Sequence, residues 1–386
     1  MLLLVVLLIG FTIFSIFNGV RAQRDNLFPE RFEIFQDIFY IIKNYYVTEV
    51  NPDELIDGAI KGMLRTLDSY STYLPEEDYD EMQVQIKGEY GGLGFIITLR
   101  NEELTIVSPF EGTPACRAGL QAGDVIMEVD GDSTEGWSLD RAVNRMRGDE
   151  GTEVTLKIKR LDGDEEETFT LDITREIIEV PFIEEELLED RIGYINLIQF
   201  GEDVGFDLQQ TLNNLKDEGA EAFILDLRNN AGGLLDEAVS VASNFIQEEP
   251  IVHIEQRDDT QTLNALPIIR AVDEPLVVLV NKGSASGSEI VAAAIKDTER
   301  GALIGTNTFG KATVQSVVPM EDGSALRLTT ARYLTSGKNV IGSDGLEPDI
   351  LIEEDIEAED DLQLERALEY LREILEDELA QLPAAG

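Results

Sequence analysis

A serine-rich turn and a lysine downstream of it are the residues of this chain best suited to covalent chemistry. The turn, GSASGS at residues 283–288, separates an apolar run at 276–280 from a helical pattern at 289–296. A turn from a strand into a helix exposes a side chain beside free backbone N–H groups, as a nucleophile requires. Lys311 lies 25 residues after Ser286, in a turn next to a glycine, and could serve as its base.

A serine–lysine pair would need no histidine. A lysine acts as a general base only when it is neutral, so such a site has to lower the lysine pKa, as burial in an apolar pocket does. The one histidine, His253, sits in a strand-like segment and is interpreted as structural or merely exposed. Gln315 follows Lys311 by four residues, so the two share a face of a strand or helix and one could orient the other.

Glycine turns could complete such a site. A second turn, with Gly232 in its Gly-Gly pair, follows a buried-strand pattern at residues 222–227. An oxyanion needs two N–H donors, which the glycine turns could supply. The local sequence also fits a plainer alternative, in which Ser286 is a helix N-cap and Glu289 closes a capping box.

Alternating elements are predicted to position these residues. From about residue 190 to 352, strand patterns alternate with helical ones, which is typical of an α/β core with parallel strands. Residues 28–85 are interpreted as a helical arm, and residues 88–175 as a small β-rich domain. The acidic stretch at 353–386 has leucines near one face of a helical pattern, and we expect it to cap the core. Residues 253–268 are polar and are expected to form a surface loop.

The β-rich domain carries two glycine motifs in order. Gly92-Leu93-Gly94-Phe95 comes first, and PACRAGLQAGDVIMEVDG follows at residues 114–131. Together they resemble a PDZ domain. In such a domain the glycines form a nest for a terminal carboxylate, and the next strand accepts a peptide as an added strand. The first four residues are therefore the predicted peptide-binding residues, the alternative being a domain that is only a spacer.

Three segments together resemble the carboxyl-terminal processing peptidases, also called tail-specific proteases. They are DLRNNAGGLL at 226–235, GSASGSEI at 283–290 and TFGKATVQ at 308–315, and the resemblance runs from about residue 30 to 350. It implies a multidomain fold, with a PDZ domain beside a crotonase-like α/β core. It also implies cleavage of proteins that are selected by their C-terminal residues, with no metal or cofactor.

The resemblance also assigns roles to single residues. Ser286 is the nucleophile, Lys311 the base, and Gln315 positions the lysine. The backbone N–H groups of Gly232 and Gly287 form the oxyanion hole. Ser286 would attack the scissile carbonyl, and water would then resolve the acyl-enzyme.

Composition limits the partners and the location of the protein. Thirty basic and 77 acidic residues give a formal net charge of −47, which argues against nucleic acid or an anionic membrane surface as a partner. A single cysteine, Cys116, excludes an internal disulfide and a multi-cysteine metal site. Residues 1–22 form an apolar run that fits either a signal peptide or a membrane anchor, so we expect the remainder to be exported.

The leading hypothesis is an exported, membrane-associated serine endopeptidase that acts on proteins with exposed C-termini. The alternative is a catalytically inactive, PDZ-bearing peptide-binding or chaperone-like protein, and a third, distant one is a crotonase-type acyl-CoA enzyme. The intact Ser286, Lys311 and Gln315 favour the first. The sequence leaves open the identity of the substrate and whether the arm or the acidic tail mediates homo-oligomerisation.

Overall fold

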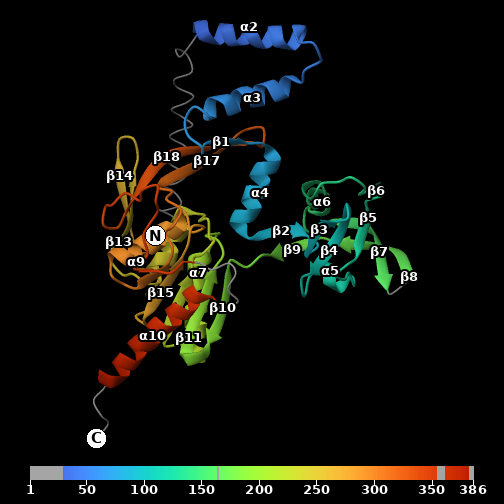
Figure 1. Ribbon diagram of the computed structural model, residues 1–386. Coiled ribbons are helices and arrows are strands. Elements are labelled where there is room, and N and C mark those ends of the chain that lie inside the picture. The colour runs from blue at the N-terminus through green and yellow to red at the C-terminus, as the bar shows by residue number, and fades with distance from the viewer. Residues whose placement is uncertain (1–28, 163–164, 354–360, 382–386) are drawn as a thin grey trace. The chain divides into compact units, whose positions relative to one another are not determined.

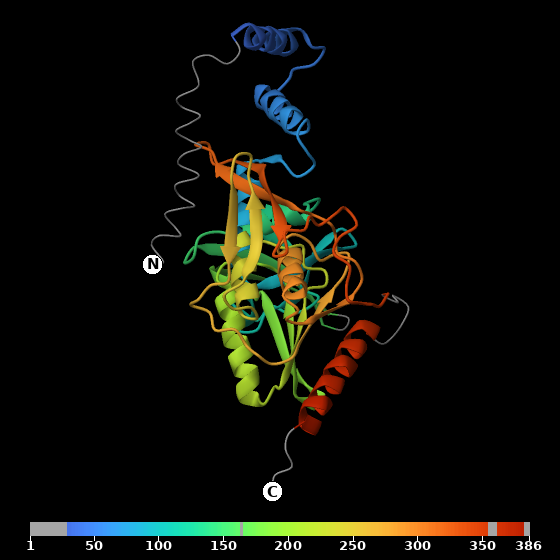
Figure 2. The same ribbon diagram turned by 90° about the vertical axis from the view of Figure 1, so that its left-hand side faces the viewer.

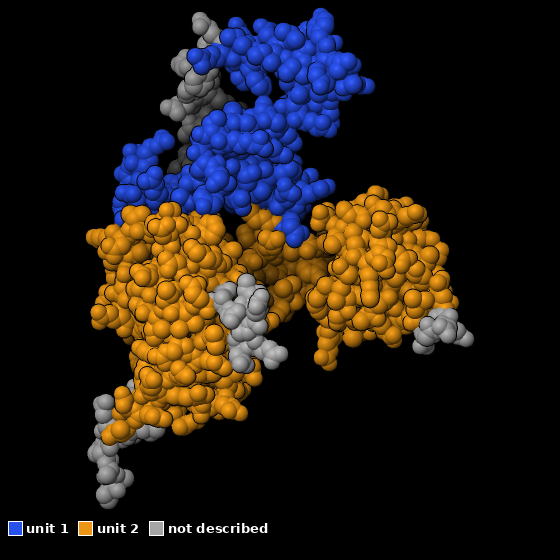
Figure 3. Space-filling view, viewed as in Figure 1, with its two compact units in different colours: residues 1–81, 253–262, 312–334 blue, residues 82–252, 263–311, 335–386 orange. Residues whose placement is uncertain are grey.

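The structure, a computed structural model (Figures 1 and 2), describes residues 29–162, 165–353 and 361–381. The apolar run at 1–22 lies outside the described residues. The chain divides into two compact units (Figure 3), which are unit 1 (residues 1–81, 253–262 and 312–334) and unit 2 (residues 82–252, 263–311 and 335–386). Gly232, Ser286, Gly287 and Lys311 all belong to unit 2, whereas Gln315 belongs to unit 1.

Unit 1 contains two helices of the region 28–85, which was predicted as a helical arm, and most of a small sheet. The arm consists of α2 (Pro29–Tyr45) and α3 (Pro52–Leu64). Asn51 caps α3 by accepting the N–H of Asp53 at 3.0 Å. The sheet has the order β1-β18-β13-β14, and β17 also pairs with β18. Its strands are β1 (Thr72–Leu74), β13 (Pro250–Glu255), β14 (Thr260–Asn264), β17 (Thr313–Pro319) and β18 (Ala325–Thr335).

The core of unit 2 is a six-stranded sheet with the order β10-β11-β12-β15-β16-β19. Neighbours from β11 to β19 are parallel, while β10 is antiparallel to β11. Every residue of β12 and β15 is buried, as parallel strands covered on both faces require. The bounds are β10 (Ile183–Leu188), β11 (Ile192–Leu197), β12 (Ala222–Asp226), β15 (Leu276–Val280), β16 (Ala302–Gly305) and β19 (Ile350–Leu351).

Helices cover both faces of this core sheet. α10 (Leu362–Gln381) packs its fully buried Ala367 and Leu371 against one face, as expected of a helix that caps the core. On the other face, Leu215 of α7 (Val204–Glu218) and Phe223 of β12 both approach Gly193. Two further helices, α8 (Leu235–Ser243) and α9 (Gly287–Asp297), follow β12 and β15 in the chain.

A second sheet of unit 2 corresponds to the PDZ-like region. Its order is β3-β4-β5-β7-β8, with β6 on β5, and β3 is an edge strand. A two-stranded ribbon, β2 with β9, leads the chain in and out of this region after α4. The bounds are α4 (Glu76–Lys87), β2 (Glu89–Gly92), β3 (Phe95–Arg100), β4 (Glu103–Pro109), α5 (Pro114–Arg117), β5 (Val125–Val129), β6 (Asp132–Ser133), α6 (Leu139–Met146), β7 (Glu153–Asp162), β8 (Glu165–Thr174) and β9 (Glu176–Glu179).

Some details of the sequence interpretation need correction. The prediction of a loop at 253–268 is wrong, because the end of β13 and the whole of β14 lie in this polar segment. The edge strand β10, whose glutamates are exposed, lies just before the predicted start of the core near residue 190 and was not predicted. Strand β16 was not predicted at all. No helix among the described residues is both long and apolar enough to cross a bilayer.

Candidate active site

Three turns follow neighbouring parallel strands of the core sheet. The glycine turn (227–233) follows β12, the serine turn (281–288) follows β15, and the lysine turn (306–311) follows β16. Because β12, β15 and β16 are adjacent and parallel, the three turns lie at the same edge of the sheet. In α/β proteins this carboxyl edge is where ligands bind.

Buried hydroxyl groups join the glycine turn to the serine turn. The Ser284 hydroxyl donates to the Leu227 carbonyl at 2.7 Å, and the Ser288 hydroxyl donates to the Asn230 carbonyl at 2.8 Å. The N–H of Ala285 donates to the same Asn230 carbonyl at 3.0 Å. Both serines are completely buried, so their hydroxyls serve to fasten the two turns together.

Ser286 differs from these two serines in exposure and in backbone conformation. It is half-buried and occupies the N-cap position of α9. Its φ of 53° and ψ of −110° fall in a region that residues with a side chain rarely adopt. Strain at a strand-to-helix turn is typical of an exposed nucleophile. The structure therefore separates Ser286 from its two neighbours in the cluster.

Glu289 ties the serine turn to the lysine turn. Its fully buried carboxylate accepts the N–H groups of Ser286 and Lys311 on one oxygen, Oε2, each at 3.0 Å. The two backbone nitrogens therefore lie within twice that distance of each other. The other oxygen, Oε1, accepts the Gly310 N–H at 2.8 Å and the Thr308 hydroxyl at 2.6 Å. The capping box of the plainer interpretation is present, with Ser286 as the N-cap and Glu289 three residues later, but Glu289 also binds the lysine turn, which that interpretation did not predict.

Gly232 lies directly against the serine turn. A Cβ atom built on it would be 2.8 Å from both Ser286 Cβ and Gly287 N, and its φ is +99°, so glycine is required there. The two predicted oxyanion donors thus come from turns that meet at Ser286. The Gly232 N–H donates to Asn230 Oδ1 at 2.9 Å. To stabilise an oxyanion, this N–H has to exchange the Asn230 oxygen for the oxygen of the substrate.

Gln315 lies on β17 in unit 1. Its amide nitrogen donates to the hydroxyls of Thr313 at 2.9 Å and Thr329 at 3.3 Å. A β-bulge between Val314 and Gln315 interrupts the alternation of side chains along this strand. A spacing of four therefore no longer implies that Gln315 and Lys311 share a face, and the positioning role of Gln315 stays a prediction.

His253 is a buried residue of β13. Its Nδ1 atom lies 2.8 Å from the hydroxyl oxygen of Thr262 on β14, which agrees with a structural role. Within the described residues, no group of three or more His, Cys, Asp and Glu side chains could hold a metal ion.

The predicted peptide-binding residues lie where β2 ends and β3 begins. Gly92 ends β2, and Phe95 begins the edge strand β3. The Leu93 carbonyl accepts the N–H of Ala115, on α5, at 2.9 Å, which anchors the intervening segment. Since β3 pairs with β4 on one side only among the described strands, its other side could receive an added peptide strand.

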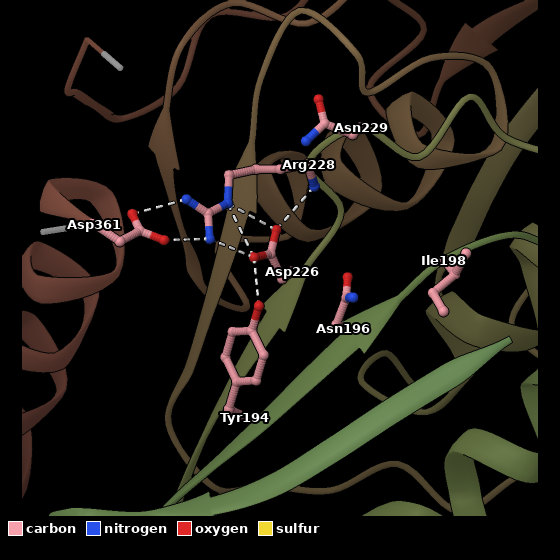
Figure 4. Close-up of a pocket in the computed structure, with 7 residues that line it drawn as sticks. All are labelled: Tyr194, Asn196, Ile198, Asp226, Arg228, Asn229 and Asp361. Carbon is pink, nitrogen blue, oxygen red and sulfur yellow. Dashed lines mark hydrogen bonds and ion pairs between the residues drawn. The ribbon is translucent and has the colours of Figure 1, made fainter. Parts of the chain in front are cut away.

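A charge cluster borders the glycine turn (Figure 4). Arg228 donates through Nε and a terminal nitrogen to the carboxylate of Asp226, at distances from 2.6 to 3.0 Å. The Tyr194 hydroxyl donates to Asp226 Oδ2 at 2.8 Å, and Asp361, next to α10, accepts from Arg228 at 2.9 Å. With Asn196, Ile198 and Asn229, these residues line a cavity of about 470 Å³.

The ionisation of this cluster follows from its contacts. Burial, reinforced by the Asp226 charge, raises the pKa of the Tyr194 phenol, so the tyrosine stays a neutral donor. Burial alone would lower the pKa of Arg228, but its bonds to Asp226 and Asp361 outweigh this effect and raise that pKa. The sequence patterns alone predicted no role for Asp226 or Arg228. The contact with Asp361 was missed because the partner lies 133 residues further along the chain.

Family models match three parts of the chain. Residues 191–352 match the model described as peptidase family S41, and residues 105–160 match a PDZ domain model. Residues 16–78 match the model of the N-terminal domain of the activating protease CtpB.

Similar proteins carry a consistent description. The chain is 40% identical over 326 residues to a carboxy-terminal-processing protease of Bartonella bacilliformis, covering 83% of this chain and 74% of that protein. It is 35% identical over 325 residues to the carboxy-terminal processing protease CtpA of Bacillus subtilis, covering 84% and 69%. A solved structure of the photosystem II D1 C-terminal processing protease matches with 28% identity and a TM-score of 0.48, covering 89% of this chain and 98% of that one.

Proposed function

The chain belongs to the carboxy-terminal processing peptidases of family S41, and we propose that it is an exported endopeptidase that cleaves proteins with exposed C-termini, with Ser286 as nucleophile and Lys311 as base. Membership of this family, together with the PDZ domain, indicates a serine protease that processes carboxyl termini. The observation that carries the proposed dyad is the Glu289 carboxylate, because one of its oxygens binds the backbone of both residues.

The proposed reaction is an acyl transfer in two stages. Neutral Lys311 takes the proton of the Ser286 hydroxyl as the oxygen bonds to the scissile carbonyl carbon, and it returns that proton to the leaving amine. The N–H groups of Gly232 and Gly287 would stabilise the oxyanion. Water, activated by the same lysine, then hydrolyses the acyl-enzyme and releases Ser286 for another cycle.

Selection of substrates is proposed to occur in the PDZ domain. The edge strand β3 would pair with the last residues of a substrate, and the segment from Gly92 to Phe95 would receive its terminal carboxylate. Main-chain pairing needs little sequence specificity, so proteins with exposed C-termini are the expected substrates. Cleavage then depends on both the free carboxylate and an unfolded segment that reaches Ser286.

Export and association are further parts of the proposal. The apolar run at 1–22 would direct the chain out of the cytoplasm, either as a signal peptide or as a membrane anchor. Exposed apolar side chains of α2, among them Phe32, Phe35 and Ile38, support a homo-oligomer formed through the helical arm.

The dyad is tested by cleavage of an unfolded substrate protein that ends in apolar residues. We expect Ser286→Ala and Lys311→Ala each to lower kcat at least about a thousandfold, since removing a nucleophile or its base has effects of this size or larger. Matched controls are Ser133→Ala and Lys61→Ala, which change exposed residues on β6 and α3.

Two results would contradict the dyad. One is a wild-type protein that binds the substrate but never cleaves it, as the inactive, PDZ-bearing alternative requires. The other is a Ser286→Ala or Lys311→Ala variant that cleaves as fast as its control. Folding of each variant is checked by its thermal unfolding midpoint, so that a loss of activity is not mistaken for a loss of structure.

A further inference from the structure

Arg228, at the start of the glycine turn, is bound by carboxylates from two parts of the chain (Figure 4). Asp226, from the end of β12, accepts a hydrogen bond from the Nε atom of Arg228. It also accepts one from a terminal nitrogen of Arg228, at 2.6 Å. Asp361 binds the other side of the guanidinium, with ion-pair distances of 2.8 and 2.9 Å to the two terminal nitrogens. The Arg228 side chain is 15% exposed, so these contacts are only partly screened by water.

Asp361 is at the same time the start of α10. Its side chain accepts the Leu364 N–H at 3.0 Å, and its carbonyl accepts the Glu365 N–H at 2.9 Å, as an N-cap does. The neighbouring Gln363 is buried, accepts from Arg228 at 3.2 Å and donates to the Ile352 carbonyl at 2.8 Å. The start of α10 is thus fixed both to the core and to the arginine.

The same helix is anchored by its apolar face. Ala367 and Leu371 are completely buried against residues of four core strands, namely Ile192, Ala222, Ile224, Val277, Leu279 and Ile304. Asp361 therefore has a rigid support, and it can hold Arg228 in place rather than follow its movement. Four residues after Arg228, the glycine turn reaches Gly232, which lies against Ser286.

We propose that Asp361 is a positioning residue for catalysis, which acts through Arg228 to hold the glycine turn in register with Ser286. Asp226 attaches the guanidinium only to its own turn, and Gln363 adds a single uncharged contact at 3.2 Å, so without Asp361 the turn has more freedom to shift. Asp361 connects the guanidinium to a separate element and removes that freedom. Small misplacements of catalytic groups have large effects on rate.

The variant Asp361→Asn isolates this contact. Asparagine is as good an N-cap as aspartate, so the start of α10 is preserved while the charge that binds Arg228 is lost. Arg372→Ala is the matched control. It removes another ion pair between α10 and the core, Arg372 with Asp190 at 2.6 Å, which has no link to the glycine turn. Asp361→Glu retains the charge and should restore part of the activity.

The inference rests on the proposed function, so two measurements on the full chain are combined. In cleavage of the unfolded substrate, we expect Asp361→Asn to lower kcat about tenfold or more with KM changed less than twofold, and Arg372→Ala to keep the wild-type kcat. In hydrogen–deuterium exchange, the segment 227–233 should exchange faster in Asp361→Asn than in the wild type, and at the wild-type rate in Arg372→Ala.

The outcomes separate the two proposals. Equal kcat values for Asp361→Asn and Arg372→Ala, or equal exchange rates of segment 227–233 in these two variants, would overturn the positioning role of Asp361. The activity of Ser286→Ala would still test the dyad. If the wild type fails to cleave, the proposed function fails instead, and the exchange measurement alone then decides whether Asp361 holds the turn.

Discussion

Three serines share the turn 283–288, and the partners of their hydroxyl groups give them different tasks. Ser284 and Ser288 are buried and bind carbonyls of the glycine turn, whereas Ser286 is half-buried and holds a strained backbone conformation. The residue type alone could not separate the three. Burial and hydrogen bonding could, because a nucleophile has to be reachable by its substrate.

Replacement of the two buried serines tests this division. We expect Ser284→Ala and Ser288→Ala each to lower the free energy of unfolding by about 0.5–1.5 kcal/mol, because each removes a buried hydrogen bond to a carbonyl of the glycine turn. Their kcat should fall far less than that of Ser286→Ala. Urea unfolding and steady-state cleavage measure the two effects. If Ser288→Ala were as inactive as Ser286→Ala, the assignment of Ser286 as the nucleophile would be wrong.

Glu289 is the residue at which the serine and lysine turns depend on one another. In Glu289→Gln, an amide nitrogen replaces one carboxylate oxygen and cannot accept the N–H and O–H groups that point at it. We expect about 1–3 kcal/mol of lost stability and a kcat about tenfold lower. The control is Glu299→Gln, an exposed position beyond the end of α9. Equal kcat values for these two variants would rule out the bridging role.

At the level of elements, the chain enters and leaves the PDZ-like domain at one point. The ribbon of β2 and β9 closes where the Val180 N–H donates to the Gly88 carbonyl at 2.7 Å. An excursion whose two ends are in contact can be removed without stretching the chain that remains.

This closure allows residues 89–179 to be replaced by a short Gly-Ser linker. If the domain recruits substrates and controls access to Ser286, the shortened enzyme should lose the preference for a free C-terminal carboxylate over a C-terminal amide, and its basal rate should change. The ratio of kcat/KM for the two forms of one substrate measures this. A shortened enzyme with the wild-type ratio and rate would refute both roles.

The start of α10 predicts a dependence of stability on pH. Partial burial disfavours ionisation of Asp361, but hydrogen bonds from Arg228 and from the Leu364 N–H outweigh it and lower the pKa of this carboxyl group. A lowered pKa means that the stabilisation is fully present above the unfolded value, about 3.9, and is lost as the pH falls through the folded value. The difference in unfolding free energy between wild type and Asp361→Asn should therefore be constant from pH 7 to about pH 5 and shrink below pH 4. A difference that keeps its full pH 7 value at pH 3 and below would show that the charge is not its source.

The sequence predicted those elements best that have an apolar run between clear turn residues. The apolar run at 276–280 coincides with β15, and the buried-strand pattern at 222–227 agrees with β12 to within one residue. Strands β10 and β14 were missed because their own residues are largely polar, and pairing with a neighbouring strand decides their conformation. In the site, Ser286 and Lys311 were recognisable from their types and spacing. The role of Glu289 was not, because it depends on the lysine turn folding back onto α9.

For the whole molecule, the dominant property is a formal net charge of −47. Like charges repel more strongly in a compact chain than in an expanded one, and salt weakens this repulsion, since the screening length falls from about 30 Å at 0.01 M to about 10 Å at 0.1 M. We expect the thermal unfolding midpoint to rise by several degrees between 0.01 and 0.5 M NaCl, and equally in KCl. A midpoint that falls with salt would show that ion pairs, such as Lys157 with Glu128, outweigh the repulsion.

The arrangement of the three turns determines how much of the chain has to be synthesised before the protein can become active. Ser286 is made before Lys311, whose backbone N–H binds Glu289, and Arg228 receives its second carboxylate only from residue 361. No contiguous stretch of chain builds the site, so a partly synthesised chain contains the serine without its lysine turn. We expect such chains to be unable to cut themselves or their neighbours, although they are synthesised among unfolded polypeptides.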